Sequence, residues 1–225
     1  MSTLRRVLVV GAGGLGCPVL LGLGPDVRLT IVDHDRVEVS NLQRQILHRT
    51  TDVGRFKAES AAEALGRRWP GSAVEPRVTR LDPTNAHDLV STHDVIIDGT
   101  DSFDAKFLLN DVCCELSVPL VHGAVLGLTG QLMTVMPGTA CYRCIFEAPP
   151  LPGAAASCQE AGVLGAVCGV IGGRMAREAK AVLVGAPTLA GTLLVFDGLR
   201  NRWRSMTPRP RAACPAHRAP EVATW

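Results

Sequence analysis

The sequence predicts an α/β fold, in which a mostly parallel sheet carries helices on both faces and continues into an antiparallel C-terminal extension. Strand-like runs alternate with helix-like runs through the first half of the chain, as they do in parallel sheets. In the second half, strand-like runs follow one another through short turns, as antiparallel strands do. With 225 residues, 47% of them hydrophobic, the chain can form one domain with a substantial core.

The first half of the chain is expected to supply the parallel strands and most of the helices that cover them. A buried strand begins at about residue 6 and leads into a glycine-rich turn that ends at residue 16. Further strands are predicted at 27–33, 73–81 and 94–101. Helices are predicted at 17–23, 55–69, 85–91 and 104–117, and in the segment 55–69 apolar residues recur at helical spacing.

The second half is expected to extend the sheet and to add one long helix. Strands at 119–126 and 130–138 are joined by a short turn, and strands at 192–198 and 202–208 form a closing hairpin. A mainly helical segment is predicted at 162–185, and the stretch 147–157, rich in Pro, Gly and Ala, is typical of a surface loop. The chain is therefore predicted to form a single domain.

Charge and hydropathy argue against two classes of protein. The net charge of +2 is too small to suggest a protein that binds nucleic acid or a membrane surface. Residues 7–24 carry no charge, but six of them are glycine and one is proline, which is unusual for a membrane-spanning helix. We therefore expect a cytoplasmic protein, in which eight cysteines favour metal binding or catalysis over disulfides.

The motif GAGGLG lies between the first predicted strand and the first predicted helix. Gly11, Gly13 and Gly14 would let backbone N–H groups approach phosphate oxygens, and the helix N-terminus would favour the anion. Asp33, at the end of the next strand, is placed to bind a ribose hydroxyl. These features predict an adenine-nucleotide site in a Rossmann-like fold, although an NAD-linked oxidoreductase would have them too.

The run DRVEVSNLQRQIL, residues 35–47, favours ATP over a dinucleotide. An enzyme that cleaves ATP must neutralise a triphosphate, for which Arg44 offers a planar guanidinium and Asn41 and Gln43 offer neutral donors. Lys57 adds a second cation near the start of a predicted helix.

Asp101 closes the predicted strand 94–101, at the sheet edge where ligands of parallel sheets bind. It is a candidate Mg²⁺ ligand, because Mg²⁺ is held by one or two carboxylates together with phosphates. Taken singly, Lys57 or Asp101 could be a surface charge or a helix cap, but their succession in the chain favours an ATP–Mg²⁺ site.

Together these motifs carry a resemblance to a known family. GAGGLG, followed by D-x-D-x-V-x-x-SNLQRQ-x-L, D-x-G-x-x-K and D-x-T-D, resembles the ThiF/MoeB/HesA family, bacterial relatives of ubiquitin-activating enzymes. The resemblance covers nearly the whole chain. It implies an enzyme that adenylates the C-terminal carboxylate of a small ubiquitin-like sulfur-carrier protein ending in Gly-Gly, with ATP and Mg²⁺. It also implies a homodimer, and one adenylation domain over 1–225 with a nucleotide-binding half at about 1–118 and a carrier-binding and zinc half at about 119–225.

By matching position, the resemblance assigns roles to individual residues. It places Asp33 on the ribose, Asp101 on Mg²⁺, and Arg44 with Lys57 on the triphosphate, so that the last three are expected to be catalytic. The residues expected to line the nucleotide site are Gly11, Gly13, Gly14, Asp33, Asp35, Ser40, Asn41, Gln43, Arg44, Lys57, Asp101 and Ser102.

Two short motifs, CYRC and CPAH, have the spacing of a structural zinc site. A site built from Cys141, Cys144, Cys214 and His217 would pin the C-terminal segment to the body of the domain. A redox pair is the alternative for CYRC taken alone. The resembled family usually has four cysteines here, so His217 is a departure, although imidazole binds zinc well.

The remaining cysteines comprise one candidate nucleophile and four apolar residues. Cys158 lies between the predicted loop and a helix, and a cysteine at a helix N-terminus can have a lowered pKa. In some members of the resembled family the matching cysteine takes part in sulfur transfer or in a covalent link to the carrier. The cysteines expected to be buried as small hydrophobic residues are Cys17, Cys113, Cys114 and Cys168.

Two departures from the resembled family keep a second interpretation open. Family members carry a helix before the first strand, with an arginine that reaches the ATP of the partner subunit, whereas here the first strand is expected at about Arg6. Ser102 stands where the family usually has Asn. The main alternative is thus a non-catalytic or weakly active partner subunit that binds a carrier, and an NAD-linked oxidoreductase is a remote one.

Overall fold

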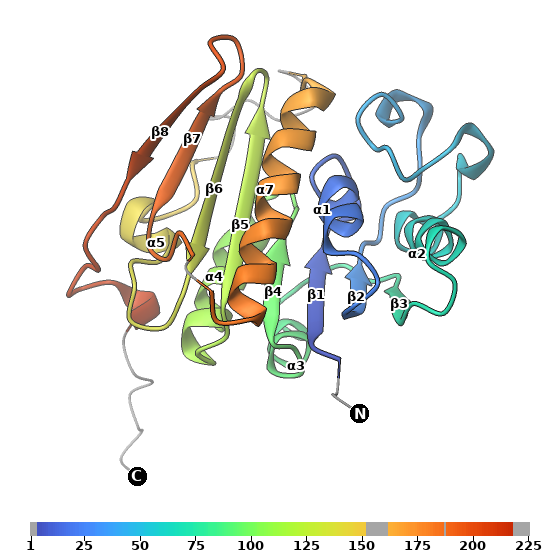
Figure 1. Ribbon diagram of the computed structural model, residues 1–225. Helices are drawn as coiled ribbons and strands as arrows, with labels where there is room; N and C mark the ends of the chain where they lie inside the picture. Colours follow the sequence, from blue (N-terminus) through green and yellow to red (C-terminus); the bar gives the residue numbers. More distant parts are fainter. Residues whose placement is uncertain (1–3, 152–161, 187, 218–225) are drawn as a thin grey trace.

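Five parallel strands form the first part of the sheet. They are β1 (Arg6–Val10), β2 (Arg28–Val32), β3 (Val74–Arg77), β4 (Val95–Asp98) and β5 (Leu120–Leu126). The computed structural model describes residues 4–151, 162–186 and 188–217 and is shown in Figure 1. β1 lies between β2 and β4, with Val9 paired to Ile31 on one side and to Ile97 on the other.

Three antiparallel strands continue the same sheet. They are β6 (Thr129–Val135), β7 (Leu193–Asp197) and β8 (Arg202–Met206). The strand order across the eight-stranded sheet is β3-β2-β1-β4-β5-β6-β7-β8, and each pair from β5 to β8 is antiparallel. The predicted fold class, a mostly parallel sheet with an antiparallel extension, is confirmed.

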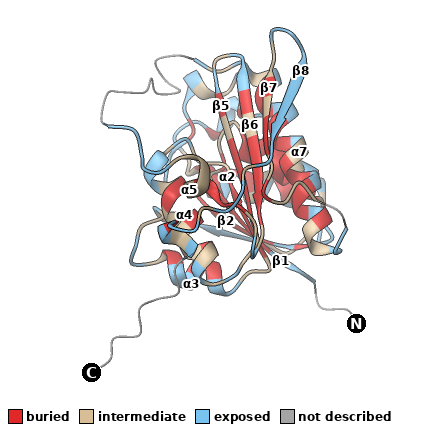
Figure 2. Ribbon diagram, turned by 90° about the vertical axis from the view of Figure 1, so that its left-hand side faces the viewer, coloured by how far each residue is buried: buried red, intermediate tan, exposed pale blue. Residues whose placement is uncertain are grey.

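Helices cover both faces of the sheet. One face carries α1 (Gly16–Leu23), α2 (Lys57–Arg68) and α7 (Gly165–Leu183). The other carries α3 (Ala86–Ser91), α4 (Phe103–Glu115) and the short α5 (Tyr142–Ile145). Figures 1 and 2 show the two layers, with the buried residues concentrated along the sheet and the inner sides of the helices.

The alternation of side chains in β1 explains why the domain has two cores. Val7 and Val9 pack with α1, α2 and α7, whereas Leu8 and Val10 point to the opposite face and pack with α3 and α4. A strand that is buried on both faces consists of an uninterrupted run of apolar residues, and RVLVV predicts a buried strand for this reason.

The third strand and the connection before it differ most from the prediction. β3 is shorter than the predicted strand 73–81 and largely exposed, because it is an edge strand. Pro76 lacks an N–H, and Pro is tolerated at a sheet edge. Between β2 and α2 the chain forms two short 3₁₀ turns, Val39–Asn41 and Thr50–Asp52, which pattern reasoning did not resolve.

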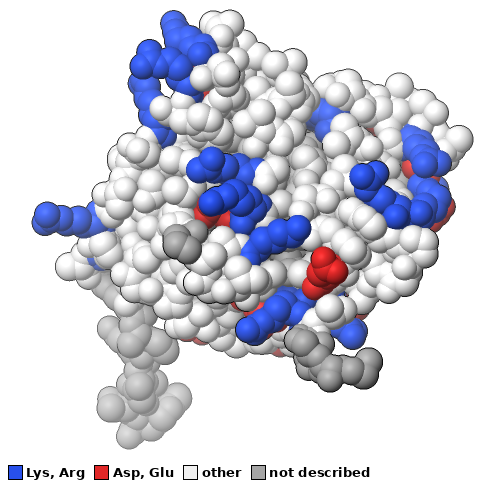
Figure 3. Space-filling view, in the orientation of Figure 1, with Lys and Arg blue, Asp and Glu red and all other residues white. Residues whose placement is uncertain are grey.

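The apolar N-terminal run forms β1, the glycine turn and α1 within the core. In the part of the chain that the structure describes, no helix has the length and apolar character needed to cross a membrane. On the face seen in Figure 3, Lys and Arg side chains lie in several separate groups, with Asp and Glu between them.

Candidate functional site

The glycine loop after β1 and the turn after β4 meet at the carboxyl edge of the sheet. From β1 the chain moves outward to β2 and β3 and then returns to β4 on the other side of β1, so this edge is a topological switch point. Ligands of open α/β sheets bind at such points. Figure 1 shows the loop above β1, beside α1.

Gly11 must be glycine because its backbone touches the turn after β4. Its φ of +94° lies in the left-handed region, and a Cβ there would stand 2.9 Å from the carbonyl carbon of Gly99. Gly11 N–H donates to the carbonyl of Val32 (2.8 Å), and Gly99 N–H donates to the carbonyl of Val10 (2.9 Å). The close approach holds the ends of β1, β2 and β4 together beneath the loop.

Asp33, expected to bind the ribose, also holds the glycine loop. Its carboxylate accepts one hydrogen bond from Ala12 N–H (2.7 Å) and one from Asp35 N–H (2.8 Å). The residue is only 8% exposed, and burial raises the pKa of its carboxyl group. Each oxygen keeps a second lone pair, so these contacts are compatible with the predicted ribose contact.

Lys57 is a buried lysine that forms an ion pair with Asp35. Its Nζ lies 2.7 Å from Asp35 Oδ2, and the lysine is 7% exposed. Burial opposes ionisation of Asp35, but the hydrogen bond and charge of Lys57 lower the pKa of that carboxyl group. The pair orients the ammonium group at the start of α2, next to the end of β2.

Arg44 lies against the glycine loop and is held by the chain around it. Its Nη2 donates to Asn41 Oδ1 (2.7 Å), and Asn41 and Ser40 both donate to Glu38 Oε2. A Cβ at Gly14 would lie 3.4 Å from Arg44 Cδ, so the side chain crosses the loop at its third glycine.

The start of α7 packs against the backbone of Gln43 and Arg44. A Cβ at Gly165 would lie 2.9 Å from the carbonyl oxygen of Gln43, so only a residue without a side chain fits there. The Gln43 side chain itself is exposed.

Asp101 and Ser102 follow β4 and take different positions. Asp101 is exposed, and its carboxylate has no side-chain partner within the described residues. Ser102 is the N-cap of α4, where its Oγ accepts a hydrogen bond from Ala105 N–H (3.4 Å). Asp101 is thus available to a cation, whereas the Ser102 hydroxyl already stabilises a helix end.

Two buried polar residues near the loop were missed by sequence reasoning. His48 bridges the loop to α2, because one ring nitrogen lies 2.9 Å from the carbonyl oxygen of Ala12 and the other 2.8 Å from Ser60 Oγ. Burial lowers the pKa of His48. Gln45 is buried beside Gly13, and its Oε1 is buried with no hydrogen-bond partner among the residues that the structure describes. Gln45 belongs to the run 35–47 that the sequence singles out, and His48 follows that run directly, but no pattern assigns a role to either residue.

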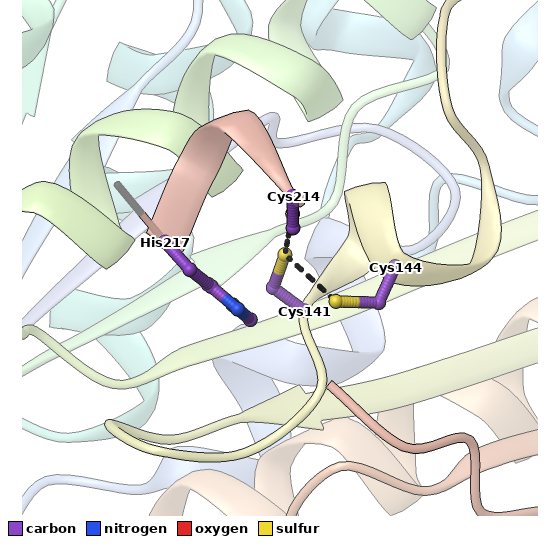
Figure 4. A group of neighbouring side chains, drawn as sticks. All are labelled: Cys141, Cys144, Cys214 and His217. Atoms are coloured by element: carbon purple, nitrogen blue, oxygen red, sulfur yellow. Dashed lines mark hydrogen bonds between the residues drawn. The ribbon is translucent and has the colours of Figure 1, made fainter. Parts of the chain in front are cut away.

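The predicted zinc ligands come together. One ligand atom from each of Cys141, Cys144, Cys214 and His217 lies within 4.8 Å of all the others. Figure 4 shows the four side chains converging from the start of α5 and from the 3₁₀ turn Pro215–His217.

The sulfur geometry fits zinc. Cys141 Sγ lies 3.8 Å from Cys144 Sγ and 3.6 Å from Cys214 Sγ. Tetrahedral ligands at about 2.3 Å from zinc stand about 3.8 Å apart, so the spacing suits the ion. Burial raises the pKa of Cys214 to about 11, so a cation is needed to convert this thiol to the thiolate that binds metal.

Groups around the cluster support its sulfur atoms. Arg211 N–H donates to Cys144 Sγ (3.4 Å), and Asn110 Nδ2 donates to Cys141 Sγ (3.7 Å). Cys114, expected to be a buried hydrophobic residue, is only partly buried, and a hydrogen bond with its thiol is the main reason that the pKa of Cys141 is raised. The other three cysteines expected to be buried, Cys17, Cys113 and Cys168, are buried. The candidate nucleophile Cys158 lies outside the described residues.

Comparisons with known proteins agree on the family. The model of the ThiF family matches residues 2–216. The chain is 43% identical over 216 residues to the SAMP-activating enzyme E1 of Haloferax volcanii, covering 93% of this chain and 79% of that protein. It is 43% identical over 221 residues to the sulfur carrier protein adenylyltransferase of Thermus thermophilus, covering 93% and 80%.

A longer relative and two solved structures are also similar. The chain is 42% identical over 212 residues to the adenylyltransferase and sulfurtransferase MOCS3 of Anopheles gambiae, covering 91% of this chain and 47% of that protein. The crystal structure of E. coli MccB with ATP has a TM-score of 0.81 at 18% identity, covering 95% of this chain and 67% of MccB. PaaA has a TM-score of 0.76 at 19% identity, covering 92% and 65%, so both structures speak to the fold alone. From its sequence motifs, its family match and its close relatives, the chain belongs to the ThiF family.

Proposed function

We propose that the chain is an ATP-dependent adenylyltransferase that activates the C-terminal carboxylate of a small ubiquitin-like sulfur-carrier protein. The observation that carries the proposal is the gathering of the glycine loop, Arg44, Lys57 and Asp101 around the carboxyl ends of β1, β2 and β4. The names of two relatives, a SAMP-activating enzyme E1 and a sulfur carrier protein adenylyltransferase, support the same chemistry and the use of ATP.

In the proposed reaction, the carrier carboxylate attacks the α-phosphorus of ATP. The bond from that phosphorus to the oxygen that bridges to the β-phosphate breaks, which yields an acyl-adenylate and pyrophosphate. A carboxylate is already ionised at neutral pH, so the step requires no general base. Catalysis then rests on positioning and on stabilisation of phosphate charge.

The chain's own cations are held in place before a nucleotide binds. Arg44 is fixed by Asn41 and by its contact with Gly14, and Lys57 is fixed by Asp35. Such groups need little rearrangement as charge builds up on the leaving pyrophosphate. The glycine loop would present backbone N–H groups to phosphate oxygens from the start of α1.

Asp101 is the residue that would hold Mg²⁺, which when bound neutralises phosphate charge. The exposed carboxylate fits this role because its oxygens are free of side-chain partners among the described residues. Zn²⁺ would be held by Cys141, Cys144, Cys214 and His217, where it would cross-link the C-terminal segment to α5 and play a structural part.

The proposal extends to features that the described residues do not reach. The carrier tail, ending in Gly-Gly, would pass under the loop around 145–157 toward the nucleotide, and Cys158 could then take part in sulfur transfer. We further propose a homodimer that works in the cytoplasm.

The test is ATP–pyrophosphate exchange with candidate carriers that end in Gly-Gly. We expect exchange with one of them, reduced by about 10²-fold or more in Lys57→Ala and in Asp101→Ala. Asp104→Ala is the matched control, because Asp104 is an exposed aspartate in the first turn of α4 and should leave exchange unchanged. Exchange that survives both site variants would refute the proposed mechanism.

Two further outcomes separate the alternatives. Absence of exchange with every Gly-Gly carrier would favour a non-catalytic, carrier-binding subunit. Protection against heat by NAD but not by ATP with Mg²⁺ would favour an oxidoreductase, because only a ligand that binds the native state raises the unfolding temperature.

A further inference from the structure

Asp98, the last residue of β4, is a buried carboxylate that the proposed reaction does not use. It is 0% exposed, and each of its oxygens accepts two hydrogen bonds. Oδ1 accepts from the backbone N–H (3.0 Å) and the hydroxyl (2.7 Å) of Thr100. Oδ2 accepts from Lys106 Nζ (3.0 Å) and His122 Nδ1 (2.8 Å). With all four lone-pair positions occupied, the carboxylate has a single orientation.

The two donors on the far side of Asp98 are anchored in other elements. Lys106, on α4, also donates to the carbonyl oxygen of Gly123 on β5 (2.6 Å). His122, on β5, packs its ring against Tyr142, with ring centroids 4.6 Å apart. α4, β5 and the start of the zinc-binding segment therefore all brace this carboxylate.

The surroundings of Asp98, Lys106 and His122 determine which of the three side chains are charged. Burial alone would raise the pKa of Asp98, but the charge of Lys106 and the hydrogen bond from His122 hold it far below its usual range. Burial lowers the pKa of His122, so this ring is neutral and donates through Nδ1–H. The result is one fixed anion and one fixed cation, Asp98 and Lys106.

Asp98 controls a turn that matters to the nucleotide site. Thr100, which it holds, lies between Gly99, which touches Gly11 of the glycine loop, and Asp101. A Cβ at Gly11 would also lie 3.2 Å from Thr100 N. The turn is thus clamped by Asp98 at one end and by the Ser102 cap at the other.

Stability does not explain a buried ion pair at this place. Desolvation of two charges offsets most of their attraction, and an apolar pair of similar volume is often as stable. What the ion pair does provide is a rigid turn, and sites that bind and orient reacting groups depend on such support. We propose that Asp98 is a positioning residue, which fixes Thr100 and so sets the place of the Asp101 carboxylate beside the glycine loop. The inference rests on the proposed function, because Asp101 is taken as the Mg²⁺ ligand.

The experiment removes one hydroxyl group and leaves the ion pair intact. Thr100→Val keeps the shape of the side chain but loses the 2.7 Å bond to Asp98, and Thr100→Ser restores a hydroxyl. Thr134→Val is the matched control, because Thr134 is buried on β6 and donates to another buried carboxylate, Glu178 (3.3 Å). Calorimetry would measure binding of a non-hydrolysable ATP analogue over a series of Mg²⁺ concentrations, so that no carrier is required.

We expect Thr100→Val to raise the Mg²⁺ concentration for half-maximal binding about tenfold, since one hydrogen bond to a charged group is lost. Its affinity for the analogue without Mg²⁺, the Mg²⁺ dependence of Thr100→Ser and that of Thr134→Val should each stay within about twofold of wild type. An unchanged Mg²⁺ dependence in Thr100→Val overturns the inference, as does an equal change in Thr134→Val, which would reflect a general loss of stability.

The two proposals can fail separately. Analogue binding by the wild type without exchange on any carrier overturns the proposed function only, and the Thr100 series still decides the role of Asp98. A wild-type protein that does not bind the analogue with Mg²⁺ overturns both.

Discussion

Two buried lysines, each paired with an aspartate, allow a sharp test of how the exposure of the partner sets the stability lost when a lysine charge is removed. Lys57 and Lys106 are 7% and 3% exposed, so their own burial is nearly the same. The partners differ, because the Asp35 side chain is 53% exposed and the Asp98 side chain is 0% exposed. Replacing each lysine with Met removes the ammonium group and keeps much of the aliphatic chain.

The difference between the partners sets the expected loss of stability. In Lys57→Met, Asp35 stays hydrated, so the loss should not exceed about 1 kcal/mol. In Lys106→Met, Asp98 becomes an uncompensated buried charge, which costs about 3–5 kcal/mol. For a chain of this length, these losses correspond to falls in Tm of up to about 4 °C and of about 6–20 °C, respectively.

For Lys57→Met we expect a small loss of stability but a large loss of catalytic activity. Loss of one preorganised charge at the site should lower kcat/KM for ATP–pyrophosphate exchange by about 10²–10³-fold in Lys57→Met, although the protein remains folded. Thermal unfolding followed by circular dichroism, together with the exchange assay at a temperature where both variants are folded, measures both quantities. A Lys57→Met protein as unstable as Lys106→Met, or one that keeps wild-type exchange, would refute this reasoning.

Three further predictions follow from other contacts. Zinc should copurify with the protein, and a wild-type protein without zinc would contradict the site. Cys214→Ser should release zinc to a chromophoric chelator at a far lower chelator concentration than wild type does, whereas His217→Cys should retain it. The pKa values of His48, His93 and His122 are all lowered from 6.5, mainly by burial, so the unfolded chain takes up protons that the native state does not. The midpoint of urea unfolding should therefore be highest above pH 6.5 and fall as the pH decreases below it, and a midpoint that is constant from pH 7 to 5 would show that these rings are not held neutral. On α7, Gly172→Ala should lower stability by about 1–3 kcal/mol, because its Cβ would lie 2.5 Å from Pro18 Cγ and 2.9 Å from Leu15 O. Gly173→Ala, with nothing within 4 Å, should raise it by up to about 1 kcal/mol, and equal effects in denaturant unfolding would contradict the packing of α7 on α1.

The parts of the molecule that could be predicted from sequence are those whose structure is determined by local sequence patterns. The buried strands are apolar runs, and the glycine loop is a contiguous motif whose close approach to Gly99 only glycine permits. The zinc ligands could be paired because each half of the site is a short chelate, CYRC or CPAH, and the two halves do lie together.

The parts that could not be predicted depend on residues brought together from separate elements. The partners of Asp98 come from α4 and β5, and no periodicity of strand or helix relates Lys106 and His122 to the end of β4. Ser102 is expected in the nucleotide site because of the motif it follows, and its additional role as the N-cap of α4 was not predicted.

Cys114 illustrates a further limit of local patterns. The two cysteines of α4 are neighbours in sequence, but adjacent helical residues point about 100° apart. Cys113 therefore faces the core and Cys114 approaches the zinc ligand Cys141. Apolar sequence context alone does not separate the two.

The packing of α7 on α1 also has a consequence for how the protein folds during its synthesis. The glycine loop and the run that carries Arg44 leave the ribosome well before the helix that covers them. Until Gly165 and Gly172 have been synthesised, the side of α1 that packs against α7 is uncovered, and the nascent nucleotide half exposes a hydrophobic surface there. A chain stalled before α7 should therefore be a substrate for chaperones, and acquisition of the finished site should coincide with docking of this one helix.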